Sequence, residues 1–289
     1  MNKIENLLWR AKMQKDKNWL EARNLLNDAL EEEPTNIDIL KTIADLYQSK
    51  KLYHKAIVYY QMIIVQNKED EQAIFRAANC FLSLKEFKIA IDYYDKIKLP
   101  FPELLYNKAF AYSKLKKNDK GIEILKELLR YKVSSEIPYI FIAELYFTKK
   151  KFNEAIFYLD KAETSFGKRG TIFYLRGLAN FQLHHWLKAY VEFQNAEKMK
   201  VRTPHFYRTY GITCEMIGKT ARAVDLILKC IKILPFEPAG YIELINLYLN
   251  HNRTMEAYSI VKLAKKNLPT SITISLLYNK ILENLNKKE

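Results

Sequence analysis

Histidine and cysteine are the side chains here best suited to metal binding or nucleophilic catalysis, and neither kind is grouped for it. The five histidines are scattered, and the one adjacent pair, His184 and His185, has no further ligands in the local sequence. Three cysteines form no Cys-x-x-Cys pair, and an odd number builds no disulfide framework. Glycine-rich phosphate loops, nucleophile elbows and HExxH motifs are also missing from the sequence. We therefore expect no enzyme, no metal and no cofactor.

The composition favours long helices joined by short turns. Hydrophobic residues make up 49% of the chain and charged residues 28%, with only 7 Gly and 8 Pro among 289 residues. An all-β fold would need more turn residues. The most apolar stretch, residues 56–65, contains Gln61 and is too short to span a membrane. We expect a cytoplasmic protein without membrane insertion, whose cysteines are small buried core residues.

A small residue recurs along the chain at a nearly fixed interval. The separations are 34, 34, 31, 34, 34, 34 and 34 residues, between Ala22, Ala56, Ala90, Gly121, Ala155, Ala189, Ala223 and Ala257. If this residue is numbered position 20 of a repeat, position 17 is aromatic in five of eight repeats and position 8 is small in six. Apolar residues follow helical spacing twice in each repeat, so each repeat predicts two helices that are stabilised by stacking.

These positions resemble the tetratricopeptide repeat, which has small residues near positions 8, 20 and 27, aromatics at 4, 11, 17 and 24, and proline at 32. The resemblance implies an all-α fold, a right-handed superhelical solenoid of antiparallel helix pairs. It covers residues 3–271 as a single solenoid, and we expect residues 272–286 to form a C-terminal capping helix. The eight predicted repeats are residues 3–36, 37–70, 71–101, 102–135, 136–169, 170–203, 204–237 and 238–271.

Two departures from the repeat pattern have structural consequences. The 31-residue step coincides with Pro100 and Pro102, which predict a shortened second helix in the third repeat. Position 15, where the first helix ends, favours glycine, yet here it is glycine only at Gly218 and lysine in four repeats. We expect these lysines to reduce the stability of their turns.

The resemblance implies that positions 2, 5, 6, 9, 12 and 13 line a concave groove. In repeats three to six these positions hold many large aromatics, which we interpret as a surface that grips an apolar peptide or helix of a partner protein. Packing of the aromatics against each other is the alternative. Asn79 and Asn107 match the two asparagines of the carboxylate clamp with which some tetratricopeptide-repeat proteins bind chaperone C-termini. The clamp's basic positions are occupied here by Phe75, Ile137 and Phe141, so no such clamp is expected. The predicted groove residues are Phe75, Arg76, Asn79, Tyr106, Asn107, Phe110, Phe141, Glu144, Phe147, Tyr174 and Phe181.

A basic edge is the second predicted surface. The net charge is +14, and residues 102–289 account for +13 of it. Lysines recur at positions 14–17 of the repeats, so they should line up along one side of the stack and could attract a polyanion. Ordinary solvated turn lysines are the alternative. The predicted edge is Lys50, Lys51, Lys85, Lys116, Lys117, Lys149, Lys150, Lys151 and Lys219.

The sequence thus predicts a non-enzymatic scaffold that binds a protein segment. Nucleic-acid binding through the basic edge and self-association are the alternatives. The final helix has an apolar face of Leu276, Leu277, Ile281 and Leu285 opposite a polar one, as a cap would, which favours a monomer. The partner's identity does not follow from the sequence.

Overall fold

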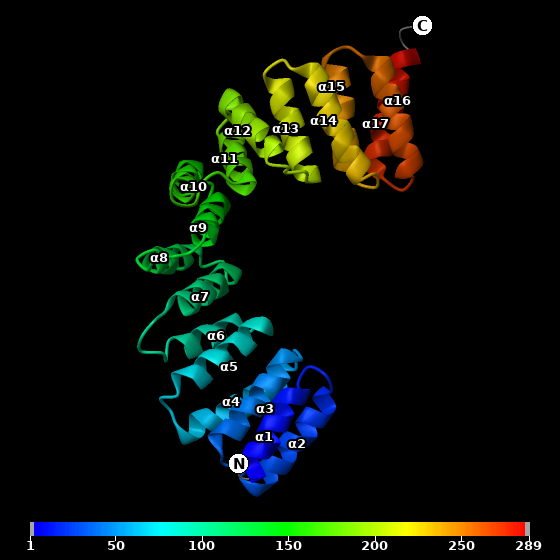
Figure 1. Cartoon of the computed structure of the whole chain (residues 1–289). Coiled ribbons are helices and arrows are strands. Elements are labelled where there is room, and N and C mark those ends of the chain that lie inside the picture. Colours follow the sequence, from blue (N-terminus) through cyan, green and yellow to red (C-terminus); the bar gives the residue numbers. More distant parts are fainter. Residues whose placement is uncertain (1–2, 287–289) are drawn as a thin grey trace. The chain divides into compact units, whose positions relative to one another are not determined.

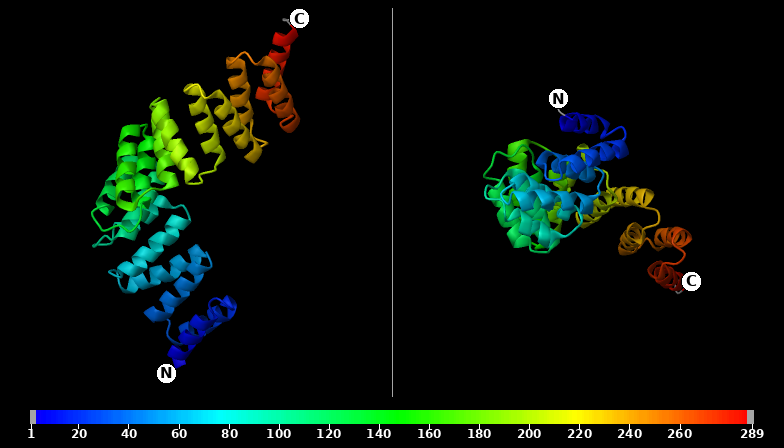
Figure 2. Two further views of the ribbon diagram at one scale, coloured as in Figure 1. Left: turned by 45° about the horizontal axis from the view of Figure 1, so that its top comes forward. Right: turned by 90° about the horizontal axis from the view of Figure 1, so that it is seen from below.

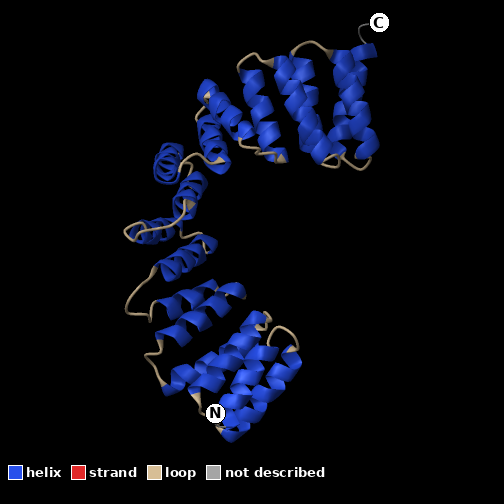
Figure 3. Cartoon of the chain, viewed as in Figure 1, coloured by secondary structure: helices blue, strands red, loops and turns tan. Residues whose placement is uncertain are grey.

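The computed structural model describes residues 3–286, and the regular elements in that range are all α-helices (Figure 3). Their bounds, labelled in Figure 1 where there is room, are α1 Lys3–Gln14, α2 Trp19–Glu32, α3 Ile37–Ser49, α4 Tyr53–Gln66, α5 Glu71–Ser83, α6 Phe87–Tyr94, α7 Pro102–Lys114, α8 Asn118–Leu128, α9 Ile137–Thr148, α10 Phe152–Phe166, α11 Gly170–Gln182, α12 Trp186–Lys198, α13 Pro204–Met216, α14 Thr220–Ile233, α15 Pro238–Asn250, α16 Thr254–Asn267 and α17 Ile272–Asn286.

The helices belong to two compact units that meet in sequence between Pro138 and Tyr139. In the first unit α1 packs on α2, α3 on α4, α5 on α6 and α7 on α8, and each pair also contacts the next. The second unit repeats this arrangement of packed helices from α10 to α17 (Figure 2). Helix α9 joins α10 through the stacked rings of Tyr146 and Tyr158, whose centroids are 5.7 Å apart. The predicted all-α class of stacked helix pairs is confirmed. The repeat boundaries and the single solenoid stay predictions.

Small residues stand where the paired helices approach each other. Ala44, at position 8 of the first helix, and Ala56, at position 20 of the second, have no exposed surface. Larger side chains at these positions would force the two backbones apart. The three cysteines are free and buried as predicted, and burial raises the pKa of the Cys80 and Cys214 thiols to about 12.

The turn inside most helix pairs is a Schellman motif. In the second repeat the Lys51 N–H donates to the Gln48 carbonyl and the Leu52 N–H to the Tyr47 carbonyl, both at 2.9 Å. This pattern requires a left-handed residue after the helix, and Lys51 has φ 59°. The same two bonds and a positive φ recur at position 15 of every later repeat, at Lys85, Lys116, Lys150, His184, Gly218 and Asn252.

Exchange of Lys51 for glycine should stabilise the protein by about 0.5–1 kcal/mol. The left-handed conformation is costly for a residue with a Cβ, whereas glycine adopts it freely. Lys50 is the matched control, because it precedes Lys51 but has an ordinary φ of −90°. In urea denaturation Lys51→Gly should raise the midpoint and Lys50→Gly should lower it. Equal effects of the two exchanges would contradict this account of the turn.

The predicted irregularity in the third repeat is confirmed. Helix α6 has only 8 residues, and α7 begins at Pro102, where proline's missing N–H costs nothing. The Lys98 N–H after α6 donates to Glu71 Oε1 at 2.8 Å, and Ile97 is buried, so the connecting segment is held against the third repeat.

The final helix packs three of the four predicted apolar residues into the core, and Ile274 takes the place of the fourth, Leu276. Ile274 and Ile281 are fully buried and Leu277 and Leu285 pack beside them, whereas Leu276 is 64% exposed. The assignment of Leu276 to the apolar face is therefore wrong, because the i, i+3, i+7 stripe starts at Ile274. Within residues 3–286 no helix combines the length and hydropathy that a membrane span requires.

Candidate functional site

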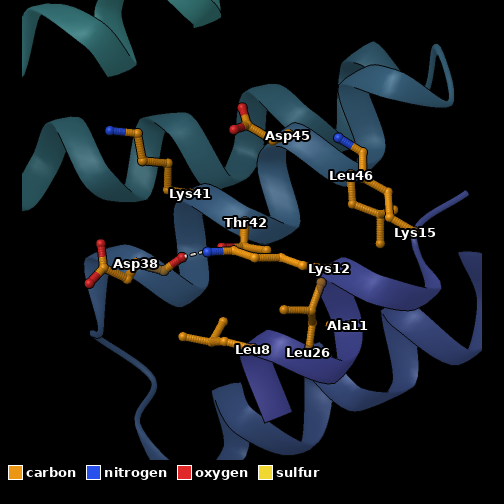
Figure 4. A pocket seen from close by; sticks show the side chains of 10 residues that line it. All are labelled: Leu8, Ala11, Lys12, Lys15, Leu26, Asp38, Lys41, Thr42, Asp45 and Leu46. Atoms are coloured by element: carbon orange, nitrogen blue, oxygen red, sulfur yellow. Dashed lines mark hydrogen bonds between the residues drawn. The ribbon is translucent and has the colours of Figure 1, made fainter. Parts of the chain in front are cut away.

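The first helices of repeats one to four carry two successive cavities in the first unit. The cavity between α1 and α3 has a volume of about 400 Å³, and Figure 4 shows the side chains that line it. The next cavity, between α5 and the start of α7, measures about 410 Å³. Lys41 connects them, because it lines the first cavity and its ammonium donates to the Gln72 side chain of the second. We call the two together the unit-one groove.

Helical spacing explains why these side chains share one face. Residues three or four apart in a helix lie above one another, and positions 2, 5, 6 and 9 of a repeat follow that spacing. In the second repeat these positions are Asp38, Lys41, Thr42 and Asp45, and in the third repeat they are Gln72, Phe75, Arg76 and Asn79.

The first cavity has an apolar base and a charged rim. Leu8 and Ala11 of α1, Leu26 of α2 and Leu46 of α3 form the base, and Lys12, Lys15, Lys41, Asp38 and Asp45 supply the charges. The Thr42 hydroxyl is used internally, since it donates to the Asp38 carbonyl at 2.7 Å. The rim carries one more cation than anions and can receive a carboxylate or a carbonyl oxygen.

The second cavity has an aromatic floor. Phe75 is buried and its ring meets that of Phe101 edge-on at 4.8 Å. Arg76 and Asn79 stand over this floor, and Glu71 and Glu103 complete the rim. The rim therefore has one more anion than cations, and the sign of the charge differs between the two cavities.

Buried tyrosines of the second helices orient the residue at position 9. The Tyr60 hydroxyl lies 2.6 Å from Asp45 Oδ1, and the Tyr94 hydroxyl donates to Asn79 Oδ1 at 2.5 Å. Burial raises the pKa of both phenols, so they stay protonated and act as donors. The Asn107 amide also donates to Asn79 Oδ1, at 3.0 Å, so two bonds fix the Asn79 amide and leave its NH₂ to face a ligand.

Three of the predicted groove residues, Phe75, Arg76 and Asn79, thus line a cavity. Asn107 lies beside them, and the half-buried Phe110 meets the Phe87 ring at 6.5 Å. Tyr106 is likewise half-buried. The hydrogen bond from Asn107 to Asn79 occupies part of the polar capacity of both amides. The role of these residues in partner binding stays a prediction.

The predicted groove residues of the second unit are mostly in contact with neighbouring rings. Phe147 meets Phe152 at 5.6 Å, Phe181 meets Trp186 at 5.3 Å, and Tyr174 meets Phe206 at 5.9 Å. Phe141 is half-buried, and Glu144 is exposed. These contacts explain why large aromatics stand at these positions, through packing within a unit.

The predicted basic edge lies at the Schellman turns. Lys50 and Lys149 are half-buried, and the other seven lysines of the edge are exposed. His184 and His185 occupy the same turn in the sixth repeat, and in residues 3–286 no group of three or more metal-ligating side chains is placed to hold an ion. Polyanion binding along this edge stays a prediction.

The residues of the first cavity were missed at the sequence level. They occupy the groove positions of repeat two, so the same register applied to every repeat would have found them. What the register could not supply is Lys12, at position 10 of the first repeat, because its approach to α3 depends on how the helix pairs stack.

Comparison with known proteins gives two family matches. Residues 49–128 match the model of the anaphase-promoting complex, cyclosome, subunit 3, and residues 138–165 match that of the tetratricopeptide repeat. A search of curated proteins finds no match.

Solved structures share the fold at low sequence identity. The C-terminal part of a tetratricopeptide-repeat-containing protein from Cytophaga hutchinsonii is 19% identical with a TM-score of 0.67, over 81% of this chain and 97% of its own. The hetero-tetramer Cut9-Hcn1 of the anaphase-promoting complex is 15% identical with a TM-score of 0.55, over 91% of this chain. MamA is 20% identical with a TM-score of 0.51, over 55% of this chain and 93% of its own. This chain spans about half, 52%, of the Cut9-Hcn1 chain it matches.

Proposed function

We propose that this chain, a tetratricopeptide-repeat protein, is a non-enzymatic scaffold whose unit-one groove binds an extended segment of a partner protein. The observation that carries the proposal is the pair of cavities, about 400 and 410 Å³, that follow one another along α1, α3, α5 and α7 and are connected by Lys41. Clefts of this size with an apolar floor and a few fixed polar groups are typical of binding sites.

The chemistry of the rim supports a peptide rather than a small apolar ligand. Asn79 presents an oriented amide, which suits the carbonyl of an extended backbone. The first cavity has a net positive rim and the second a net negative one, so a segment with an acidic and a basic side chain would match both. The similar Cut9-Hcn1 structure is a hetero-tetramer of the anaphase-promoting complex, and a scaffold role for this chain is consistent with that likeness.

Site-specific photo-crosslinking in the native host tests the groove. A photoreactive residue at Gln72 or Thr42 faces the cavities, and one at Glu123, exposed on α8 of the same unit, is the control. We expect one partner protein to be captured from both groove positions and not from Glu123. Capture that is equal from all three positions contradicts the proposal.

The affinity of variant chains for the captured partner tests the groove quantitatively. Arg76→Glu should weaken binding by about tenfold or more, and the exposed Lys68→Glu should have little effect. Tyr94→Phe removes the hydroxyl that orients Asn79 and should cost about 1 kcal/mol of binding. The aromatics Phe110 and Phe147 are poor test sites, because truncation would also remove packing against Phe87 and Phe152.

A further inference from the structure

One exposed leucine in the second unit lies between two cavities outside the groove positions. Leu187, near the start of α12, is 71% exposed and lines both of them. The cavity on one side measures about 570 Å³ and includes His184, Trp186, Met216 and Ile217. The other measures about 710 Å³ and lies between α10 and α12 over the buried side of α11.

The surface around Leu187 is apolar although it faces solvent. Val191, one turn further along α12, and Met216, at the end of α13, are each 52% exposed. The Trp186 ring is held from two sides, by Phe181 at 5.3 Å and by His184 at 4.9 Å, so this wall of the smaller cavity is fixed. Exposed apolar patches with a polar rim are typical of interaction sites. We call Trp186, Leu187, Val191, Met216 and Ile217 the Leu187 surface.

The turn beside the Leu187 surface lacks the lysine found in the turns of repeats two to five. Repeats two to five have lysine at the left-handed position of the turn, whereas the sixth repeat has His184 there, beside the apolar cavity. Cations remain on the borders of the Leu187 surface. Lys188 lines both cavities, Lys219 follows in the next turn, and the exposed Lys150 precedes Asn153, which lines the larger cavity.

The carboxylates that line the larger cavity, Asp160 and Glu192, are matched there by two cations, Arg176 and Lys188. Arg176 Nη1 lies 2.5 Å from Asp160 Oδ1, and its Nε lies 3.0 Å from Glu192 Oε1, within the larger cavity. The larger cavity is therefore not cationic. The residues that line the smaller cavity include Lys188 and no carboxylate, so the charge beside that cavity is positive and the complementary partner is acidic.

We propose that the Leu187 surface is a second docking site, which binds an acidic segment of a protein that inserts a large apolar side chain beside Leu187. The apolar side chain fills the cavity formed by His184, Trp186 and Met216, and the flanking carboxylates face Lys150, Lys188 and Lys219. This site lies in the second unit and makes no use of the unit-one groove, so it stands independently of the function proposed above.

Selection from a library of random short peptides displayed on phage tests the chemistry, with the full chain as bait. The enriched peptides should combine aspartate or glutamate with one central aromatic or large aliphatic residue. Leu187→Asp should lower the affinity for a synthetic peptide of the enriched sequence by about tenfold or more, because the apolar Leu187 side chain is no longer buried against the peptide. The control is Leu228→Asp, at an exposed leucine of α14, which should leave the affinity unchanged.

Charge and class of partner are tested with the same peptide. Lys188→Glu should lower the affinity for the peptide, and Arg76→Glu in the unit-one groove should leave it unchanged. The two proposed sites can therefore be tested separately. A version with glycine in place of the apolar residue should bind at least about tenfold more weakly. Equal binding of the glycine version, or of Leu187→Asp, would overturn the proposal. If single-stranded polyuridylate displaces the peptide, and its own affinity is unchanged by Leu187→Asp, the lysines bind nucleic acid instead. That result would also overturn the proposal.

Discussion

Exchange of Arg176 for methionine should lower the free energy of unfolding by about 3–5 kcal/mol near neutral pH. The Arg176 side chain is 13% exposed and lies within 3.0 Å of three carboxylates, on Asp160 and Glu163 of α10 and Glu192 of α12. The guanidinium also lies over the Phe173 ring, 5.5 Å from its centroid. Without it, two largely buried carboxylates lose their counter-charge and face each other across the site.

The loss should be smaller in mildly acidic solution. Burial raises the pKa of Glu192 above its ordinary value even with Arg176 present, and removal of the cation raises it further. A carboxyl whose pKa is higher in the folded state binds protons more tightly there, so stability falls as the pH rises through that range. The variant should therefore lose stability with rising pH more steeply than the wild type. Urea denaturation at several pH values measures this slope.

Two further variants separate buried charge from lost packing. Arg253→Met removes an arginine whose ion pair with Glu256 is exposed, and it should change the stability little. Addition of Glu192→Gln to Arg176→Met should restore part of the stability and flatten the pH dependence. An Arg176→Met effect as small as that of Arg253→Met, with no change in slope, would show that the cluster contributes little.

Exchange of Gly177 for valine should destabilise the second unit by about 3 kcal/mol. A Cβ on Gly177 would lie 2.6 Å from Phe193 Cε1 and 2.7 Å from Cδ1, which is closer than non-bonded carbon atoms pack in proteins. Phe193 has no room to retreat, because it is fully buried among the rings of Phe206 at 5.9 Å and Tyr210 at 5.6 Å. The better helix propensity of valine offsets only a small part of this cost.

A double-mutant cycle tests the contact directly. Phe193→Leu alone should destabilise through the lost ring, but in the Gly177→Val background it relieves the clash. The two exchanges together should therefore cost clearly less than the sum of their separate effects in thermal or urea unfolding. Additive effects would mean that valine is accommodated by a shift of α11 instead of being resisted by the ring.

The repeat period, and with it the helix pairs, could be predicted from the sequence. Small residues at 34-residue intervals mark where helices touch, and that spacing depends only on local periodicity. The 31-residue step and its two prolines placed the shortened α6 correctly for the same reason. The lysines at position 15 were recognised as unusual, and their left-handed φ follows from the turn that repeats two to eight share.

The candidate sites depended on tertiary structure to a much greater degree. The groove register placed Phe75, Arg76 and Asn79 on one face, but it could not tell that Asn107 and Tyr94 bond to Asn79, or that Lys41 reaches Gln72. Those partners are 15 to 31 residues apart in sequence. Likewise Arg176 stands at a packing position where its sequence neighbours give no hint of Asp160 and Glu192.

The sequence by itself determined that this chain is a stack of helix pairs with small residues at the contacts and with one shortened repeat. Only the tertiary structure decided which of the many polar and aromatic side chains gather into the unit-one groove and which are occupied by packing. The physical reason is range. Helical periodicity is set by backbone hydrogen bonds four residues apart, whereas a cavity is the space left between side chains of different helix pairs, and its shape depends on how those pairs pack.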